Sequence, residues 1–351
     1  MPLLARMLAS PLFVDIRAGA VDDLAELFTE RRISANGRVL VAVGPGQGEQ
    51  IWERVNGALD EAGVFTVTGA SLAAAGELQE ALHERAYDAV VGIGGGRTLD
   101  VAKYAATRVG VPMVAVATNL AHDGICSPVA SLEHSGGKGS FGVAMPLAVV
   151  VDLDYVRAAP ARMVRSGVGD AISNLSAIED WQLAHRERGE VIDGLAVTFA
   201  RTAAEAMLHR EDGIADEEFL IALAEALVLS GMAMSVAGTS HPCSGACHEF
   251  IHAVDSLFPD TANHGELAGV GALFAYHLRG NATRFEQIAD CLRRHDLPLS
   301  PDDLGLTVEQ FATAVQRAPE MRPDRYTILE HLALDEREIH SAVSTYVDAV
   351  G

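Results

Sequence analysis

The segment around residue 250 gathers side chains that bind metal ions. It reads His241-Pro-Cys-Ser-Gly-Ala-Cys-His248-Glu-Phe-Ile-His252, and Asn263-His264-Gly265 follows soon after. His248 and His252 are four residues apart, so on a helix they would lie on one face, one turn from each other. Two imidazoles at that spacing, with His264 on the next loop, suit a divalent metal such as zinc. The segment therefore predicts a metal centre.

The same residues also match a second kind of metal chemistry. His248-Glu249-Phe-Ile-His252 fits the H-E-x-x-H pattern of zinc proteases, in which the glutamate is the general base. A protease would need Glu249 beside the metal and a third ligand from a nearby helix. An oxidoreductase would instead need a nucleotide-binding part elsewhere in the chain. The remainder of the sequence decides between the two interpretations.

A helix must position these histidines. Apolar residues recur at near-helical spacing and predict a buried stripe: Cys247, Phe250, Ile251, Val254 and Phe258. His248, His252 and Asp255 fall on a neighbouring face. Ser244 and Gly245 precede the stripe, and we expect the Ser244 hydroxyl to cap the first free amides of this helix.

Composition limits the class of protein. The 351 residues are enough for one large or two ordinary domains, and 49% hydrophobic with 21% charged residues is typical of a soluble globular enzyme. No run of eighteen apolar residues occurs, so we expect no membrane span. Arg6 interrupts the apolar start Met1 to Pro11, which shows no clear cleavage site and does not indicate a secretory signal.

Charge and cysteine content exclude further classes. A net charge of −22 argues against a nucleic-acid partner, because phosphate backbones require a basic surface. The four cysteines show no C-x-x-C spacing: Cys126, Cys243, Cys247 and Cys291. Without a signal sequence, they indicate reduced thiols and a cytoplasmic protein.

The first half of the chain alternates strands and helices. Short apolar runs predict strands over 39–43, 64–68, 89–93, 112–116 and 147–151, and helical periodicity predicts helices over 47–62, 73–85 and 98–107. Strands separated by helices indicate a parallel sheet covered on both faces. The Gly- and Ser-rich stretch from Asn119 to Phe141 predicts a hairpin with loops.

The second half is helical. Helices are predicted over 172–187, 192–209 and 216–236, then in the histidine segment, and from about residues 266, 283, 307 and 335. The change in pattern places a boundary at Ala159-Pro160. We therefore expect a nucleotide-binding α/β domain over 1–160 and a helical metal- and substrate-binding domain over 161–351, with a cleft between them.

A glycine-rich turn in the first half could hold a nucleotide. Gly94-Gly95-Gly96 directly follows the strand 89–93 and precedes a helix. Glycines allow a pyrophosphate to approach the backbone, and the helix amino end offers free amides. Asp100 is expected in the first helical turn. The triplet is not the G-x-G-x-x-G fingerprint, so a standard Rossmann dehydrogenase fits poorly.

Several stretches in order resemble one superfamily, the iron-containing (group III) alcohol dehydrogenases and dehydroquinate synthases, and within it the sn-glycerol-1-phosphate dehydrogenase family. The stretches are Gly94 to Lys103, Thr118 to Pro128, Pro146 to Asp152, Ser166 to Ser173, Ser244 to His252, His264 to Glu266 and Arg325 to Leu329. They span about residues 90 to 330. The resemblance implies a dehydroquinate synthase-like fold with an α/β nucleotide-binding domain and an all-α domain.

The resemblance also implies roles for single residues. Zinc, with Fe²⁺ or Ni²⁺ as alternatives, would be held by Asp170, His248 and His264. Asp123, Asp170 and His252 would contact the substrate and act in catalysis. NAD or NADP would lie along a set of backbone and side-chain positions: Gly94, Gly95, Gly96, Asp100, Thr118, Asn119, Leu120, Ala121 and Ser127.

The activity implied by the family is an NAD(P)-linked, metal-dependent reduction of dihydroxyacetone phosphate to sn-glycerol 1-phosphate, a step of phospholipid metabolism. The metal would polarise the substrate oxygen, and Asp123 with His122 or His252 would relay the proton. A homo-oligomer, dimeric or larger, is expected.

Alternatives remain open at this point. They are an NAD-using sugar-phosphate cyclase of the dehydroquinate synthase type, a dehydrogenase of an unphosphorylated polyol, and a binding protein without turnover. Two residues depart from the family pattern: Cys247 stands where glutamate usually precedes the ligand His248, and Cys126 stands where a small residue precedes Ser127. We expect both thiols near the active site, where they bear on substrate identity.

Overall fold

The computed structural model describes residues 9–28, 32–59, 62–135 and 137–351. Most of the segment Met1 to Pro11, judged above for a secretory signal, lies outside the described residues. The chain divides into two compact units. The first comprises Met1–Asn119 and Gly124–Ala159, and the second comprises Leu120–Asp123 and Pro160–Gly351. Leu120–Asp123 thus groups with the second unit, although the sequence analysis placed it in the first domain.

The first unit is built on a six-stranded parallel sheet, which confirms the predicted fold class. Its strand order is β1-β8-β5-β4-β2-β3. The strands are β1 (Phe13–Arg17), β2 (Val39–Val43), β3 (Gly63–Thr66), β4 (Ala89–Gly94), β5 (Met113–Ala117) and β8 (Ala148–Asp152). Sequence analysis missed β1, because this edge strand is half-exposed and carries polar Asp15 and Arg17 among its five residues.

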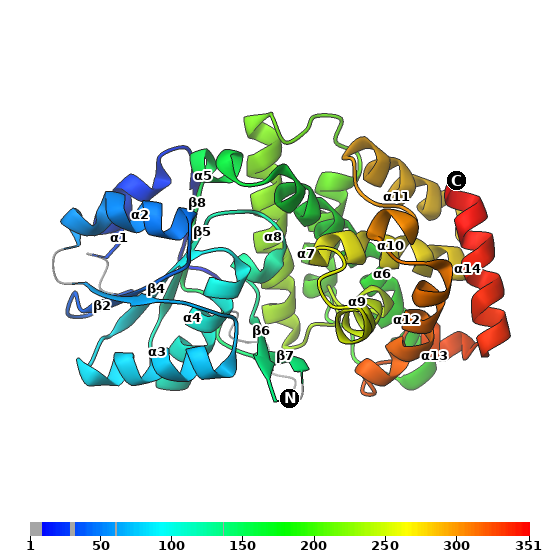
Figure 1. Cartoon of the computed structure of the whole chain (residues 1–351), viewed down its shortest axis with the longest axis horizontal. Coiled ribbons are helices and arrows are strands. Elements are labelled where there is room, and N and C mark those ends of the chain that lie inside the picture. Colours follow the sequence, from blue (N-terminus) through cyan, green and yellow to red (C-terminus); the bar gives the residue numbers. More distant parts are fainter. Residues whose placement is uncertain (1–8, 29–31, 60–61, 136) are drawn as a thin grey trace, which may run out of the picture. The chain divides into compact units, whose positions relative to one another are not determined.

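Helices cover both faces of this sheet (Figure 1). One face packs on η1 (Ala20–Asp23), α1 (Leu24–Leu27) and α2 (Gln47–Val55), which continues into η2 (Asn56–Ala58). The other face packs on α3 (Leu72–Glu84) and α4 (Gly96–Val109). Strand residues alternate between the faces: Val41 belongs to the core that contains Ile51, whereas Gly92 faces Leu99 and Ala102 of α4. α5 (Leu153–Ala158) ends the unit.

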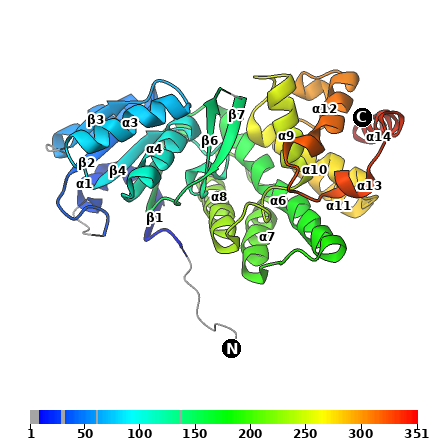
Figure 2. The same cartoon turned by 90° about the horizontal axis from the view of Figure 1, so that it is seen from below.

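A hairpin of β6 (Val129–His134) and β7 (Gly137–Gly142) lies against α4 (Figure 2), as the sequence predicted. Lys103 fastens it, although this side chain is fully buried. Its ammonium donates to the carbonyls of Gly124 at 2.9 Å and Val129 at 2.5 Å, and lies 2.9 Å from Asp100 Oδ1. A buried ammonium with such partners is satisfied, so its role is to hold the hairpin.

The second unit is helical, as predicted (Figure 2). Its helices are α6 (Ala161–Arg188), α7 (Gly194–Leu208), α8 (Glu217–Ala237), α9 (Ala246–Leu257), α10 (His264–Leu278), α11 (Ala282–Arg294), η4 (Asp302–Leu304), α12 (Val308–Met321), α13 (Ile328–Leu332) and α14 (Glu336–Val350). A further short helix, η3 (Asp123–Ile125), follows β5. α6 begins eleven residues before the prediction, so Asp170 lies inside a helix.

α8 is the one helix among the described residues that is long and apolar enough to cross a membrane. Buried residues make up 61% of its most apolar eighteen-residue window, including Phe219, Leu223 and Leu227. That degree of burial is typical of a core helix packed on its neighbours.

Candidate functional site

Three helices of the second unit bring potential metal ligands together. Asp170 comes from the middle of α6, His248 from the first turn of α9, and His264 is the first residue of α10. Their ligand atoms all lie within 4.8 Å of one another. His264 Nε2 is 3.3 Å from His248 Nε2 and 3.4 Å from Asp170 Oδ1. These three residues form the metal group.

The spacing of the metal group fits a tetrahedral ion. Donor atoms at adjacent corners of a tetrahedron with bonds of about 2.0–2.1 Å stand about 3.3–3.4 Å apart. The separations of 3.3 and 3.4 Å from His264 match that edge length, and the third pair, His248 with Asp170, lies within 4.8 Å. Two imidazole nitrogens and one carboxylate oxygen are also ligands that zinc and iron accept. The residues present therefore fit a bound divalent metal.

The Asp170 carboxylate is oriented by the backbone of the loop before η3. The amide of Asp123 donates to Asp170 Oδ2 at 2.8 Å, which leaves Oδ1 facing His264. Burial works to raise the pKa of Asp170, but the imidazoles of His264, His248 and His122 outweigh it and lower that pKa. The carboxyl is therefore ionised near neutrality, as a metal ligand must be.

His248 is held as a neutral imidazole. Burial first, and then the neighbouring His264, lower the pKa of His248 well below its usual value. Its Nδ1 lies 3.3 Å from the Cys247 Sγ. The tautomer that leaves Nε2 free for a metal puts the proton on Nδ1, and the thiol is then its weak acceptor. Burial raises the pKa of Cys247 to about 12, so this thiol stays neutral.

Close backbone packing of α6 and α10 fixes the distance between Asp170 and His264. A Cβ atom on Gly265 would lie 1.7 Å from the Ser166 carbonyl oxygen, and one on Gly169 would lie 2.1 Å from the Gly265 carbonyl oxygen. The Gly265 amide donates to Ser166 Oγ at 3.0 Å, and that hydroxyl donates to the Ala121 carbonyl at 3.1 Å. No side chain larger than hydrogen fits at either glycine without a backbone shift.

Charged side chains also hold the first turn of α10 in place. Glu266 accepts from the Asn263 amide at 2.7 Å and so caps the helix that begins with His264. Arg162 on α6 holds both oxygens of Glu266, at 2.6 and 2.8 Å. Neither Glu266 nor Arg162 was predicted to have a role, although Glu266 lies within one of the family-like stretches.

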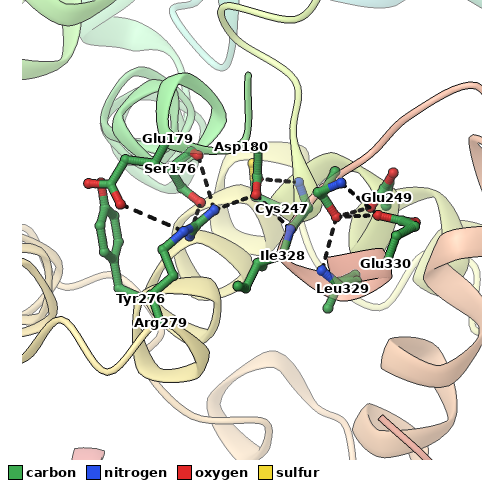
Figure 3. Close-up of polar contacts among 12 residues, drawn as sticks. Ser176, Glu179, Asp180, Cys247, Glu249, Tyr276, Arg279, Ile328, Leu329 and Glu330 are labelled. Atoms are coloured by element: carbon green, nitrogen blue, oxygen red, sulfur yellow. Dashed lines mark hydrogen bonds and ion pairs between the residues drawn. The ribbon is translucent and has the colours of Figure 1, made fainter. Parts of the chain in front are cut away.

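A distant carboxylate, rather than Ser244, caps α9. Asp180 Oδ2 accepts from the Ala246 amide at 2.9 Å, and Asp180 Oδ1 accepts from the Ile328 amide at 2.8 Å (Figure 3). Gly245 is the N-cap residue, and α9 has no side-chain cap from its own flank. The predicted Ser244 cap is therefore wrong, because a buried α6 residue 66 positions earlier provides the acceptor. No local sequence signal marks it.

The zinc-protease interpretation fails at Glu249. This side chain is 1% exposed and its Oε2 accepts from the Thr327 hydroxyl at 2.9 Å, in a cluster with Glu330 (Figure 3). Burial, then the charge of Glu330, raises the pKa of Glu249 to about 9. A protonated carboxyl in a buried polar cluster on α13 cannot act as the general base of a metalloprotease.

The remaining predicted catalytic residues lie around the metal group. The His122 ring centroid is 5.5 Å from that of His264, and the Asp123 amide binds Asp170. His252, one turn along α9 from His248, is not part of the metal group. Its Nε2 lies 3.4 Å from Arg322 Nη1. The i, i+4 pair that first suggested a metal site therefore provides one ligand candidate, and α6 and α10 provide the other two.

The glycine-rich turn of the first unit joins a strand to a helix, as the sequence predicted. Gly94 ends β4, Gly95 is the N-cap and Gly96 begins α4. A Cβ atom on Gly94 would lie 2.7 Å from Thr98 Oγ1, and one on Gly95 would lie 2.8 Å from Asn119 Nδ2. Both glycines are therefore required by close packing against Thr98 and Asn119, and pyrophosphate binding at the amino end of α4 stays a prediction.

The other predicted cofactor-binding residues lie in different places, and several already bond to the protein backbone. Thr118 follows β5 and its amide donates to the Gly94 carbonyl at 3.1 Å, so it adjoins the turn. Leu120 and Ala121 group with the second unit. Asp100 is 6% exposed and accepts from the Ser131 amide at 3.0 Å, in the second turn of α4 and not the predicted first. The Ser127 hydroxyl donates to the Val129 carbonyl at 3.4 Å.

All four cysteines are buried and free. Burial raises the pKa of Cys243, Cys247 and Cys291, the last to about 11. Cys247 contacts His248 of the metal group. The expectation that Cys126 also lies near the active site stays a prediction, because Cys126 belongs to the first unit.

Fold and site together define a class, the metal-dependent alcohol dehydrogenases that use a nucleotide cofactor. Residues 15–160 match the family described as iron-containing alcohol dehydrogenase. A crystal structure described as a probable glycerol dehydrogenase from Sinorhizobium meliloti 1021 covers 99% of this chain and 99% of its own, with a TM-score of 0.81. At 22% identity, that likeness shows a shared fold.

Closer relatives narrow the class. The chain is 35% identical over 331 residues to the glycerol-1-phosphate dehydrogenase [NAD(P)+] of Methanosarcina mazei, covering 93% of this chain and 92% of the relative. It is 36% identical over 324 residues to the enzyme of the same name from Hyperthermus butylicus, covering 91% and 92%. The chain therefore belongs to the glycerol-1-phosphate dehydrogenase family.

Proposed function

We propose that this protein reduces dihydroxyacetone phosphate to sn-glycerol 1-phosphate with NADH or NADPH, using a divalent metal held by Asp170, His248 and His264. The observation that carries the proposal is the spacing of the metal group, whose 3.3 and 3.4 Å separations suit a tetrahedral ion. Family membership supports the reaction, because the relatives are named for it. Zinc is our first choice of metal, with Fe²⁺ or Ni²⁺ as alternatives.

Two bound groups would supply the chemistry that side chains lack. The nicotinamide supplies the hydride, and a metal ion in the group supplies Lewis-acid polarisation of the substrate oxygen. The protein orients both. The cofactor would bind at the turn Gly94–Gly96 with Asp100, Thr118, Asn119, Leu120, Ala121 and Ser127, as the family resemblance implies.

The chain's own residues would place the substrate and handle its proton. Asp170 keeps Oδ1 toward the metal group because the Asp123 amide occupies Oδ2. When hydride reaches the carbonyl carbon, the substrate oxygen must gain a proton. We assign its delivery to Asp123, relayed by His122 or His252, all from the second unit.

The setting of the enzyme is part of the same proposal. Four buried, unoxidised cysteines support a reducing compartment, and we place the protein in the cytoplasm. We propose a homo-oligomer, dimeric or larger, consistent with apolar side chains that β1 leaves exposed, such as Phe13 at 42% and Val14 at 41%. Light scattering on purified protein tests this assembly.

The test of the proposed function is a cofactor-consumption assay on zinc-loaded protein with dihydroxyacetone phosphate. We expect turnover that EDTA stops and that zinc restores, and a product identified as the sn-1 isomer. His264→Ala should lose metal and activity by at least about 100-fold, while His252→Ala should retain one metal equivalent. Product formation without net NADH oxidation would indicate the cyclase alternative, and consumption of neither substrate nor cofactor would refute the proposal.

A further inference from the structure

A pair of arginines lies beside His252, one turn along α9 from His248. Arg322 follows the end of α12, and its Nη1 is 3.4 Å from His252 Nε2. Arg325 lies in the same turn, with its amide donating to the Arg322 carbonyl at 2.8 Å. Neither arginine has a part in the metal group or in the reaction as described so far.

A hydroxyl joins the two guanidinium groups. Ser240, in the loop between α8 and α9, accepts from Arg325 Nη2 at 2.7 Å and from Arg322 Nη2 at 3.4 Å. Arg325 Nη1 also donates to the Ser244 carbonyl at 3.2 Å, which fixes this arginine against the loop. Because the Ser240 oxygen accepts from both cations, its own proton is available to a third group.

In the described part of the chain, the two guanidinium groups contact an imidazole, a hydroxyl and a backbone carbonyl. Arg325 is 8% exposed, and its buried Nε has no hydrogen-bond partner among the described residues. Burial, then the charge of Arg322, lowers the pKa of Arg325 to about 10, although the charges of Asp324, Glu249 and Glu190 act to raise it. Two adjacent guanidinium groups, of which the buried one has an Nε without a partner, are the arrangement that a bound anion would stabilise in a chain of net charge −22.

The distance from the metal group indicates which anion. His248 and His252 are four residues apart on α9, a rise of about 6 Å. In a phosphorylated three-carbon ketone, the three bonds from the carbonyl carbon to phosphorus span about 4 Å, with bonds of about 1.5 Å each. A carbonyl oxygen at the metal group thus leaves the phosphate within reach of the arginine turn.

We propose that Arg322 and Ser240, with Arg325 as the positioning residue behind them, bind the phosphate of the substrate. The site would then select a short phosphorylated ketone over an unphosphorylated polyol or its ketone. This inference rests on the proposed function for its choice of substrate. Guanidinium and hydroxyl donors are the groups that recognise a phosphate monoester.

The experiment compares kcat/KM for dihydroxyacetone phosphate and for dihydroxyacetone in Arg322→Gln and Ser240→Ala. We expect the ratio of the two to fall about 30- to 100-fold in Arg322→Gln and up to about 10-fold in Ser240→Ala, the effect of losing charge-assisted hydrogen bonds. The matched control is Arg317→Gln on α12, whose guanidinium pairs with exposed Glu320 and should leave the ratio unchanged. A ratio that stays at the wild-type value in Arg322→Gln overturns the inference.

A second measurement separates this inference from the proposed function. Inorganic phosphate is titrated calorimetrically into metal-free protein, with and without Arg322→Gln. We expect the phosphate affinity of Arg322→Gln to be at least about 10-fold lower than that of the wild type. If the wild type turns over neither ketone but binds phosphate in an Arg322-dependent manner, the proposed function fails and the phosphate site stands. If phosphate binding is independent of Arg322, the site is refuted even where dihydroxyacetone phosphate is reduced.

Discussion

Adjacent residues on α9 have opposite surroundings. His248 faces Asp170 and His264, whereas Glu249 faces Thr327 and Glu330. A helix turns about 100° per residue, so neighbours in sequence point to different sides. This is why a pattern such as H-E-x-x-H, taken alone, does not identify a protease: only the direction of the glutamate decides.

Glu249 makes the stability of the fold pH-dependent. Its pKa is raised from 4.5 to about 9, so between these values the folded protein holds a proton that the unfolded chain releases. Stability is therefore lost as pH rises through this window. Glu249→Gln removes the charge, and we expect it to stabilise the protein at pH 8 on the order of 3 kcal/mol, with little effect at pH 5. Urea unfolding of both proteins at both pH values measures the change in the free energy of unfolding. An equal change at pH 5 and pH 8 would contradict the raised pKa of Glu249.

The ligand candidates show how far single residues can be predicted. Local spacing indicated His248 and His264, and the family resemblance added Asp170. The roles of Arg322 and Ser240 left no local signal, because α8, α9 and α12 bring them together from residues about 80 positions apart. The Asp180 cap of α9 was missed for the same reason.

Among the elements, α6 and α10 depend on glycine at their contact. Gly265→Ala would put a methyl group 1.7 Å from the Ser166 carbonyl oxygen. The helices would have to separate, and we expect about 3 kcal/mol of destabilisation and at least a 10-fold loss of metal affinity. Gly194→Ala at the start of α7 is the control, since nothing lies within 4 Å of its added Cβ. Chemical unfolding and metal titration measure both variants, and wild-type metal affinity in Gly265→Ala would refute this account.

The presence of a helix or strand was predictable where its apolar residues recur with a strong period. The core strands β2, β4, β5 and β8 and the helices α7 and α8 appear within about two residues of prediction. The residues at which helices begin and end were harder to predict. α6 begins at Ala161 with no side-chain cap to mark its start, and α10 begins at His264, where the local capping box of Asn263 and Glu266 was overlooked.

For the whole molecule, the metal should act as a clamp on the helical unit. Its three candidate ligands come from α6, α9 and α10, so binding would join helices that lie far apart in sequence. At a free zinc concentration of about 1,000 times Kd, we expect about 4 kcal/mol of stabilisation and a Tm higher by roughly 8–16 °C. Calorimetry with zinc and with EDTA measures the shift. His264→Ala should show almost none, and a full shift in that variant would place the metal elsewhere.

The division into a parallel-sheet unit and a helical unit was visible in the sequence, since alternating short apolar runs give way to long helical periods near residue 160. The assignment of Leu120–Asp123 was not. These four residues run from just after β5 to the first residue of η3, in a stretch with no periodicity. Two bonds tie them to α6: Ser166 donates to the Ala121 carbonyl, and the Asp123 amide donates to Asp170.

The sealed thiols have a practical consequence. Because Cys126, Cys243, Cys247 and Cys291 are all buried, with thiol pKa values raised in the last three, the native protein offers no reactive sulfur to solvent. A single cysteine engineered at an exposed position would therefore be the sole target for a maleimide dye or spin label. Labelled variants for spectroscopy during turnover could therefore be made without first replacing the four native cysteines.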